Sequence, residues 1–269
     1  MKTHIKNRLI CGSYLRPLAF VFAFITAAAT TPAAVVASYD FEGANLAAAL
    51  TSHTAATGID ASDVVLNNNS SNSSILTLTS PLTSQALVAC PGARLTAFSF
   101  SSALTNASYV SFKIKVKEGY TLSLDSFAFE AASGATSGTG GVRAFYLLSS
   151  VTGFEDDTSN ILKQDWAGDN DGVTGTLKAK GSAGPLGAYS VTLTDPDFNN
   201  AFQNFTSGEE VEFRLYFQTN GTNISVVFDN VVFNGTITAV PEPAAISLFA
   251  ALGAAALGLV VRHRRKNRA

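Results

Sequence analysis

The chain is poor in the residues that most often carry covalent or metal chemistry. Its 269 residues include two cysteines and three histidines. Cys11 lies in an N-terminal segment that we expect to be removed, so Cys90 would remain alone and no intramolecular disulfide is predicted. The apolar residues before Cys90 predict a small buried thiol, although an unpaired cysteine in an exported protein can also be reactive or pair between chains.

Sequence signatures of common active sites are also missing. The chain has no Gly-x-Ser-x-Gly motif, no histidine pair at metal-ligand spacing and no glycine-rich phosphate loop. His53 is the only histidine between the two terminal segments, and the polar stretch around it predicts a solvated loop. Carboxylates suited to glycoside hydrolysis are numerous, but nothing singles out a pair, so no catalytic residue is predicted.

Basic residues are scarce in the middle of the chain. Residues 38–239 hold 9 Lys and Arg against 19 Asp and Glu, a formal charge of −10, whereas the whole chain carries −2. An acidic domain is repelled by nucleic acid and by anionic membrane surfaces, so we expect no nucleic-acid partner.

Hydrophobic residues in this middle region recur with a period of two. Val110, Phe112 and Ile114 alternate with polar residues, and the stretch from Val211 to Phe217 does the same. This pattern indicates half-buried antiparallel strands. The phase changes between Leu124 and Phe127, which predicts a bulge near residues 125 and 126.

Ten or so such strands, separated by Gly, Ser, Asn and Thr clusters, predict an all-β fold, a two-sheet antiparallel β-sandwich. Further strands are expected at 35–41, 75–79, 94–100, 142–149, 173–179, 189–193 and 224–233. Only Phe198, Phe202 and Phe205 have the spacing of a short helix. No period of 20 to 50 residues repeats, so a propeller or solenoid is not expected.

The C-terminal thirty residues have a different composition. Pro241, Glu242 and Pro243 precede an uncharged run at 244–261, which as a helix would reach about 27 Å and so predicts a transmembrane span. Its basic tail at 262–269 predicts a cytoplasmic end and places the residues before Pro241 outside the cytoplasm. The basic residues of this tail are Arg262, Arg264, Arg265, Lys266 and Arg268.

This order of motif, helix and basic tail resembles the PEP-CTERM sorting signal of bacterial envelope proteins. The resemblance covers residues 240–269 and implies recognition of Pro241, Glu242 and Pro243 by an exosortase, a membrane-embedded cysteine peptidase, with removal of the tail. The alternative is an ordinary C-terminal anchor.

The N-terminal residues predict a signal peptide at 1–37. Four basic residues precede an apolar run at 18–29, and small residues follow it. We expect cleavage after Ala34 or Ala37, which leaves an exported domain at 38–239; an N-terminal anchor is the alternative.

The domain's first and last predicted strands resemble those of concanavalin-like and carbohydrate-binding-module jelly rolls. The matching stretches are Tyr39 to Gly43 and Phe228 to Gly235. This resemblance implies that Glu42 and Asp229 lie close together, where they could share a structural calcium ion. A second calcium candidate is the loop with Asp169 and Asp171, which offers oxygen ligands and a glycine turn but lacks the spacing of an EF-hand.

For sugar recognition, Trp166 is the leading candidate because it lies in an acidic, glycine-bordered loop, although aromatic rings in a sandwich more often belong to the core. We therefore expect an exported, non-enzymatic structural or adhesive protein of the cell envelope or of the extracellular polysaccharide matrix. A carbohydrate-binding module is the alternative, and a polysaccharide-active enzyme comes third.

Overall fold

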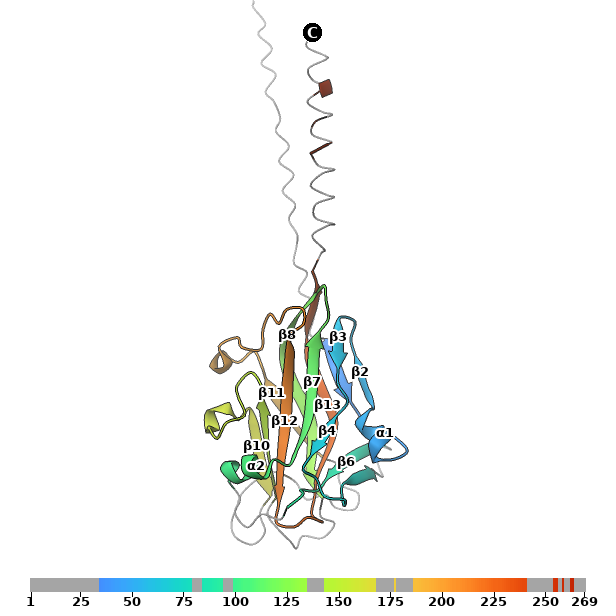
Figure 1. The fold of residues 1–269 in the computed structure, drawn as a ribbon, viewed down its shortest axis with the longest axis vertical. Coiled ribbons are helices and arrows are strands. Elements are labelled where there is room, and N and C mark those ends of the chain that lie inside the picture. The colour runs from blue at the N-terminus through green and yellow to red at the C-terminus, as the bar shows by residue number, and fades with distance from the viewer. Residues whose placement is uncertain are drawn as a thin grey trace, which may run out of the picture. The chain divides into compact units, whose positions relative to one another are not determined.

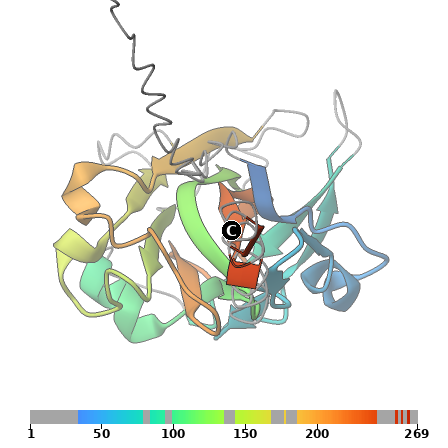
Figure 2. The ribbon, with the colours of Figure 1, turned by 90° about the horizontal axis from the view of Figure 1, so that it is seen from above.

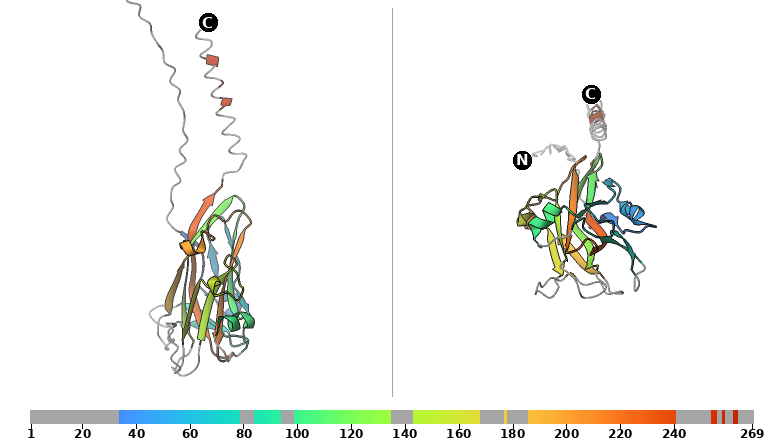
Figure 3. Two further views of the ribbon diagram at one scale, coloured as in Figure 1. Left: turned by 90° about the vertical axis from the view of Figure 1, so that its left-hand side faces the viewer. Right: turned by 60° about the horizontal axis from the view of Figure 1, so that its bottom comes forward.

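Two antiparallel β-sheets pack face to face in the computed structural model, which describes residues 34–78, 84–93, 99–134, 143–167, 177, 186–240, 254, 255, 258, 262 and 263. The strands of both sheets run along nearly the same direction (Figure 1), and the side view in Figure 3 shows the two layers. The first sheet has the order β11-β8-β13-β1-β2, with β6 and β5 joined to β13. The second has the order β10-β9-β12-β7-β3, with β4 also on β7. The all-β, jelly-roll-like sandwich is thereby confirmed.

The strands of the first sheet are β1 (Ala34–Tyr39), β2 (His53–Ala55), β5 (Ser74–Thr77), β6 (Gln85–Ala89), β8 (Tyr120–Ser133), β11 (Gly187–Thr192) and β13 (Val226–Ala239). Those of the second are β3 (Ile59–Ala61), β4 (Val65–Asn67), β7 (Tyr109–Val116), β9 (Arg143–Ser149), β10 (Lys163–Ala167) and β12 (Glu210–Thr219). Two short α-helices, α1 (Leu46–Leu50) and α2 (Phe100–Asn106), lie at opposite edges of the sandwich (Figures 1 and 2). Two 3-10 turns complete the elements, η1 (Thr158–Asn160) and η2 (Pro196–Phe198).

The period-two pattern places one face of each long strand in the core. Phe112 of β7 pairs with Phe213 of β12, and both side chains are fully buried. On β8 the predicted bulge is present, because Ser126 pairs with Asn234 while the next pair is Leu124 with Gly235. Asp125 is therefore left out of the ladder, and the phase change returns Leu124 and Phe127 to the same buried face.

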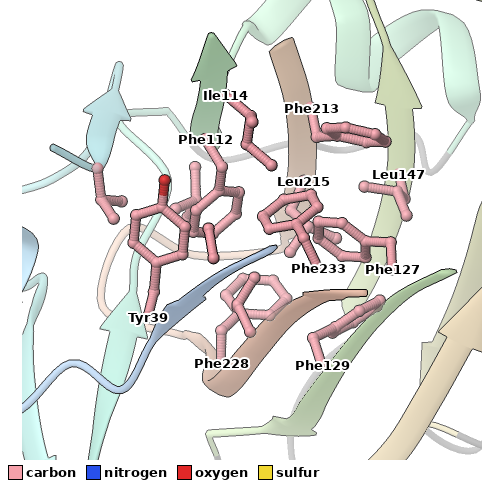
Figure 4. Packing of buried hydrophobic residues seen from close by; sticks show 14 of the residues in the cluster. Tyr39, Phe112, Ile114, Phe127, Phe129, Leu147, Phe213, Leu215, Phe228 and Phe233 are labelled. Carbon is pink, nitrogen blue, oxygen red and sulfur yellow. The ribbon is translucent and has the colours of Figure 1, made fainter. Parts of the chain in front are cut away.

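Phenylalanine rings fill the space between the sheets (Figure 4). The ring of Phe127 lies 4.6 Å from that of Phe233 and 5.2 Å from that of Phe213, measured between centroids. These rings come from both sheets, so each packs against residues far away in the sequence. Edge-to-face and offset contacts of this kind stabilise a core beyond the area they bury.

Two sequence predictions about secondary structure are wrong. The spacing of Phe198, Phe202 and Phe205 does not produce an α-helix. Asn199 caps the turn η2 with positive φ, and Asn200 and Asn204 also adopt positive φ, which an α-helix does not allow. The strand predicted at 94–100 ends too late, since Phe100 begins α2; residues 94–98 lie outside the described residues.

The helix α2 begins where a capping side chain becomes available. The Ser99 side chain accepts a hydrogen bond from the backbone N–H of Ser102, which satisfies one of the free donors at a helix start. The strand predicted at 173–179 lies outside the described residues except for Leu177, which is buried.

Strand β1 begins before the end of the expected signal peptide. Its ladder with β13 starts at the pair Ala34 and Gly235 and continues to the pair Tyr39 and Val231. A cut after Ala37 would remove more than half of β1, whereas a cut after Ala34 would keep most of it. The cleavage site stays a prediction.

Candidate functional site

The outer face of the second sheet carries an aromatic layer. Along β9, Phe145 and Leu147 belong to the core between the sheets, and the alternate residues Ala144, Tyr146 and Leu148 belong to a separate cluster. Because alternate residues of a strand point to opposite faces, this cluster lies on the outside of the sheet. We call it the outer aromatic cluster; its members are Phe100, Ala103, Leu104, Tyr109, Ala144, Tyr146, Leu148, Phe154, Ile161, Trp166 and Tyr216.

The outer aromatic cluster is covered and not open. Phe100 and Ala103 of α2 are buried in it, and Tyr146 and Tyr216 are buried beneath it. Burial raises the pKa of the hydroxyl groups of both tyrosines, so these groups stay neutral at physiological pH.

Arg214 of β12 anchors this layer. Its guanidinium carbon lies 3.9 Å from the ring centroid of Phe154 and 4.7 Å from that of Tyr109. The same group donates to both carboxylate oxygens of Glu212, at 2.8 and 3.1 Å. Partial burial opposes the charge of Arg214, but the hydrogen bonds to Glu212 outweigh it and raise the pKa of the guanidinium. The cation is thus held between two aromatic rings.

Trp166, the sequence-predicted ligand residue, belongs to this cluster. It lies on β10 opposite Ala144, and the indole is half-buried. Its Nε1 is shielded from solvent and has no hydrogen-bond partner among the described residues. The sequence placed Trp166 in a loop, but the structure places it on an edge strand, where its ring packs against the sheet.

Gln218 of β12 lies in the same cross-strand row as Trp166, since both residues are paired with Ala144. Its amide Nε2 donates to the carbonyl of Ser99 at 2.8 Å, and its fully buried Oε1 has no partner within the described part of the chain. This row therefore holds one donor and one acceptor that are shielded from solvent and have no partners among the described residues.

Asp165 precedes Trp166 but points to the opposite face, into the sandwich. It is buried and accepts a hydrogen bond of 2.9 Å from the hydroxyl of Tyr189 on β11. Because β10 and β11 belong to different sheets, this bond joins the two layers at their common edge.

A second candidate site is a buried carboxylate on β13. Asp229 is fully buried, and its oxygens accept hydrogen bonds from the Asn230 backbone N–H at 2.8 Å and from the Ser84 hydroxyl at 3.3 Å. Burial raises its pKa to about 7, and the charges of Glu130 and Glu42 act in the same direction. Glu42 therefore lies within electrostatic range of Asp229. That the two carboxylates share a calcium ion stays a prediction.

The ligands for a calcium ion at this place are few. Glu42 Oε1 accepts the backbone N–H of Gln85 at 2.9 Å, and its partner Asp229 is hydrogen-bonded as described. Within the described ranges, no three His, Cys, Asp or Glu side chains gather closely enough to hold a metal ion. Calcium prefers six to eight oxygens, so carbonyl groups or water would have to supply the rest. The candidate loop with Asp169 and Asp171 lies outside the described residues.

The two remaining sequence predictions concern single residues. Cys90 is buried, its pKa is raised by burial, and its backbone N–H donates to the Ser73 hydroxyl at 3.0 Å, which confirms the buried thiol. The solvated loop predicted for His53 is wrong, because His53 is the first residue of β2 and its ring lies 5.5 Å from that of Tyr39. The contact between His53 and Tyr39 could not be predicted from a local stretch of sequence, because the two residues lie on different strands.

The sorting residues lie almost wholly beyond the described part of the chain. Arg262 is helical and exposed. The described residues do not include Pro241, Glu242, Pro243, Arg264, Arg265, Lys266 and Arg268. No helix among the described residues is long and apolar enough to cross a membrane, and the span predicted at 244–261 falls mostly outside them.

Comparison with known proteins identifies the C-terminal segment. Residues 239–266 match the family model of the PEP-CTERM protein-sorting motif. No curated protein matches the chain.

Several solved structures are distantly similar to the sandwich. The CBM22-1 xylan-binding domain from Paenibacillus barcinonensis Xyn10C is 10% identical, with coverage of 80% of this chain and 100% of that one and a TM-score of 0.33. The K3 cleaved adhesin domain of Lys-gingipain from Porphyromonas gingivalis w83 is 12% identical, with coverage of 74% and 98% and a TM-score of 0.31. The xylan-binding module CBM15 is 14% identical, with coverage of 66% and 95% and a TM-score of 0.29. At these TM-scores the similarities say nothing about what this chain binds.

Proposed function

We propose that this chain, which carries the PEP-CTERM sorting motif at residues 239–266, is an exported, non-enzymatic structural or adhesive protein of the bacterial envelope or extracellular polysaccharide matrix. An exosortase recognises Pro241, Glu242 and Pro243 while residues 244–261 cross the inner membrane, and the basic tail at 262–269 holds the cytoplasmic end until processing.

The observation that carries this proposal is the way the sorting motif joins the sandwich. It continues directly from β13, which lies inside the first sheet between β8 and β1. Twelve residues of β13 are registered with β8, from Val226 to Ala239. At the exit, the Val240 backbone N–H donates to the carbonyl of Gly119 at 2.7 Å.

This attachment suits a protein that is held by its C-terminal end. Antiparallel ladder bonds run perpendicular to the strands, so a pull on Val240 along β13 loads many of them together. Opening them one at a time would need a force across the strand. The long registered ladder between β13 and β8 therefore resists the force that an anchored surface protein experiences.

The aromatic side chains support the same proposal. Tyr146 and Tyr216 pack into the outer aromatic cluster, and Trp166 is half-buried there, so these rings stabilise the sandwich from outside the core. The exposed large hydrophobic side chains of the described residues are the single valines Val35, Val65 and Val240.

A carbohydrate-binding module is a second candidate, favoured by the row that contains Trp166 and Gln218. The partly exposed ring of Trp166 offers a stacking surface for a sugar. The indole N–H and the Gln218 amide oxygen have no partners among the described residues but are shielded from solvent, so sugar hydroxyls would pair with them only if this row opens.

A glycan array with the released mature protein separates the two functions. The structural function predicts no specific glycan. The binding-module function predicts a specific glycan that is lost in Trp166→Ala, while Trp166→Phe, which keeps a ring in the cluster, retains part of the binding. Turnover of any polysaccharide on the same panel would contradict both.

A calcium ion shared by Glu42 and Asp229 is a separate proposal for the stability of this domain. Its support is the mutual proximity of two carboxylates, whose repulsion a cation would relieve.

A further inference from the structure

Three polar side chains meet at the edge of the sandwich where β2 and β3 approach one another. Tyr39 ends β1 and pairs across the ladder with His53 of β2, so both side chains point to the same face of the first sheet. Asp63 follows β3 of the second sheet. The Nδ1 of His53 lies 3.8 Å from Oδ1 of Asp63.

The backbone holds these groups in place from both sides. The Val64 N–H donates to the carbonyl of Leu50 at 2.8 Å, and the Ser62 N–H donates to the carbonyl of Lys113 at 3.0 Å. The segment with Asp63 is therefore tied both to the end of α1 and to β7. The close approach of Asp63 to His53 is a property of the fold and does not depend on a freely moving loop.

Tyr39 is fully buried, and its hydroxyl lies on the side of the ring that faces away from Phe228 (Figure 4). Neither its oxygen nor the Nδ1 of His53 is reached by solvent, and neither has a hydrogen-bond partner among the described residues. A buried polar atom without a partner costs about 1–3 kcal/mol. Two such atoms on neighbouring rings, whose centroids lie 5.5 Å apart, favour a bound group that satisfies both.

The exposed carboxylate of Asp63 defines the sign of that group, because it faces His53 from the open side. Asp63 keeps 65% of its side-chain surface, whereas His53 keeps 21%, so one side of the group stays open to solvent. A cation entering from that side would meet a carboxylate first and two buried lone pairs behind it.

We propose that Tyr39, His53 and Asp63 bind a divalent first-row transition ion of the Zn²⁺ type. Imidazole nitrogen and carboxylate oxygen are ordinary ligands of such ions, with metal-ligand distances of about 2.0–2.2 Å. At these lengths, the observed separation of 3.8 Å corresponds to a ligand-metal-ligand angle of about 130°, so a small movement of the exposed Asp63 would reach tetrahedral geometry. The Tyr39 oxygen supplies the third ligand, and water takes the fourth position.

The ion would join the two sheets. Tyr39 and His53 belong to the first sheet, and Asp63 is attached to the second, so the three bonds would close the sandwich at an edge that has no disulfide within the described residues. This role is independent of the sorting signal and of the carboxylate pair Glu42 and Asp229.

The test is metal binding by the full-length chain, stripped with EDTA and then titrated with Zn²⁺ by calorimetry and with Co²⁺ by visible absorption, with Ca²⁺ present throughout. We expect one ion per chain and tetrahedral Co²⁺ bands. His53→Ala and Asp63→Asn should each weaken binding by at least about tenfold, since even partners outside the ligand set change affinity by 10–100-fold. Tyr39→Phe, which keeps the ring and its packing, should also weaken it.

Two matched variants identify the site. His263→Ala removes a histidine outside the sandwich, and Asp229→Asn removes a buried carboxylate of the first sheet; both should keep the affinity for Zn²⁺. Thermal unfolding without metal checks that each variant folds. The proposal is overturned if Co²⁺ shows no tetrahedral bands, if His53→Ala binds as tightly as the wild type, or if Tyr39→Phe leaves the affinity unchanged.

Discussion

The buried carboxylate of Asp229 should make the stability of the sandwich fall as the pH rises. Burial penalises the charged form and raises the pKa of Asp229 from its ordinary 3.8 to about 7 in the folded chain. A shift of about three units corresponds to about 4 kcal/mol, since one unit is about 1.4 kcal/mol. This is a large fraction of the roughly 5–15 kcal/mol that stabilise a typical domain.

Stability falls with rising pH because folding of this chain takes up a proton at Asp229. Between about pH 4 and pH 7 the unfolded chain has lost the Asp229 proton and the folded chain keeps it, so folding takes up a proton. The contribution is fully present below about pH 4 and is lost as the pH rises through 7. Asp157 and Glu209 act in the opposite direction, because hydrogen bonds lower their pKa values, but their effect is complete at acidic pH and does not overlap the upper part of this window.

The assay is urea unfolding of the mature protein in EDTA at a series of pH values from about 5 to about 8.5. The wild type should lose about 3 kcal/mol of unfolding free energy across this range, since about two of the three pH units between the unfolded and folded pKa values lie above pH 5. Asp229→Asn should lose much less, because the amide cannot ionise, and every other group titrates in both proteins. Glu130→Gln should move the decline to lower pH, since it removes a negative charge that raises the pKa of Asp229, while the larger effect of burial remains. With that repulsion gone, the total decline should also be smaller.

Equal free energies for the wild type at the two ends of the range would refute this reasoning. A decline of the same size in Asp229→Asn would assign the effect to another group.

Three further predictions test the core, the N-terminal boundary and calcium. Phe127→Ala should lower the unfolding free energy by about 3–5 kcal/mol in urea, because the ring is fully buried among four other rings, and a loss below 1 kcal/mol would contradict that packing. A chain that starts at Ser38 should melt at a lower temperature than one that starts at Ala34, since β1 loses its first four residues, and equal melting temperatures would contradict the role of this strand. Millimolar Ca²⁺ at pH 8 should raise the melting temperature of the wild type but not of Glu42→Gln. An unchanged melting temperature of the wild type would contradict the calcium proposal.

The sequence predicts those parts of the fold in which the alternation of apolar and polar residues within one strand identifies its buried face. The alternation in β7 and β12 and the phase change at Asp125 are local patterns, and each has its expected place in the structure. The asparagines that end the turn after Phe198 show the limit of such patterns, because side-chain spacing says nothing about backbone angles.

The sequence of β9 indicates that both faces of this strand are covered. Residues 144–148 are apolar without alternation, which is typical of a strand covered on both sides, and both sides are covered here by the core and by the outer aromatic cluster. This pattern would have predicted the covering of the face on which Trp166 lies.

The candidate sites were harder to predict because their parts come from distant segments. Asp229 is close to Glu42 through the jelly-roll order of strands, which the resemblance implied. Its burial against Ser84 and its repulsion by Glu130 depend on how β6 and β8 flank β13, and no sequence window contains all four residues. The meeting of Tyr39, His53 and Asp63 likewise needs both sheets to be in place.

The central claim is that the sandwich is exported and released through its C-terminal motif. Its most direct test is the intact mass of the protein recovered outside the cell, compared between the wild type and a variant that combines Pro241→Ala with Pro243→Ala. The account predicts that the released wild type lacks the basic tail at 262–269 and that the variant keeps this tail and stays with the membrane. Release of both proteins at the same rate and with the same mass would contradict it.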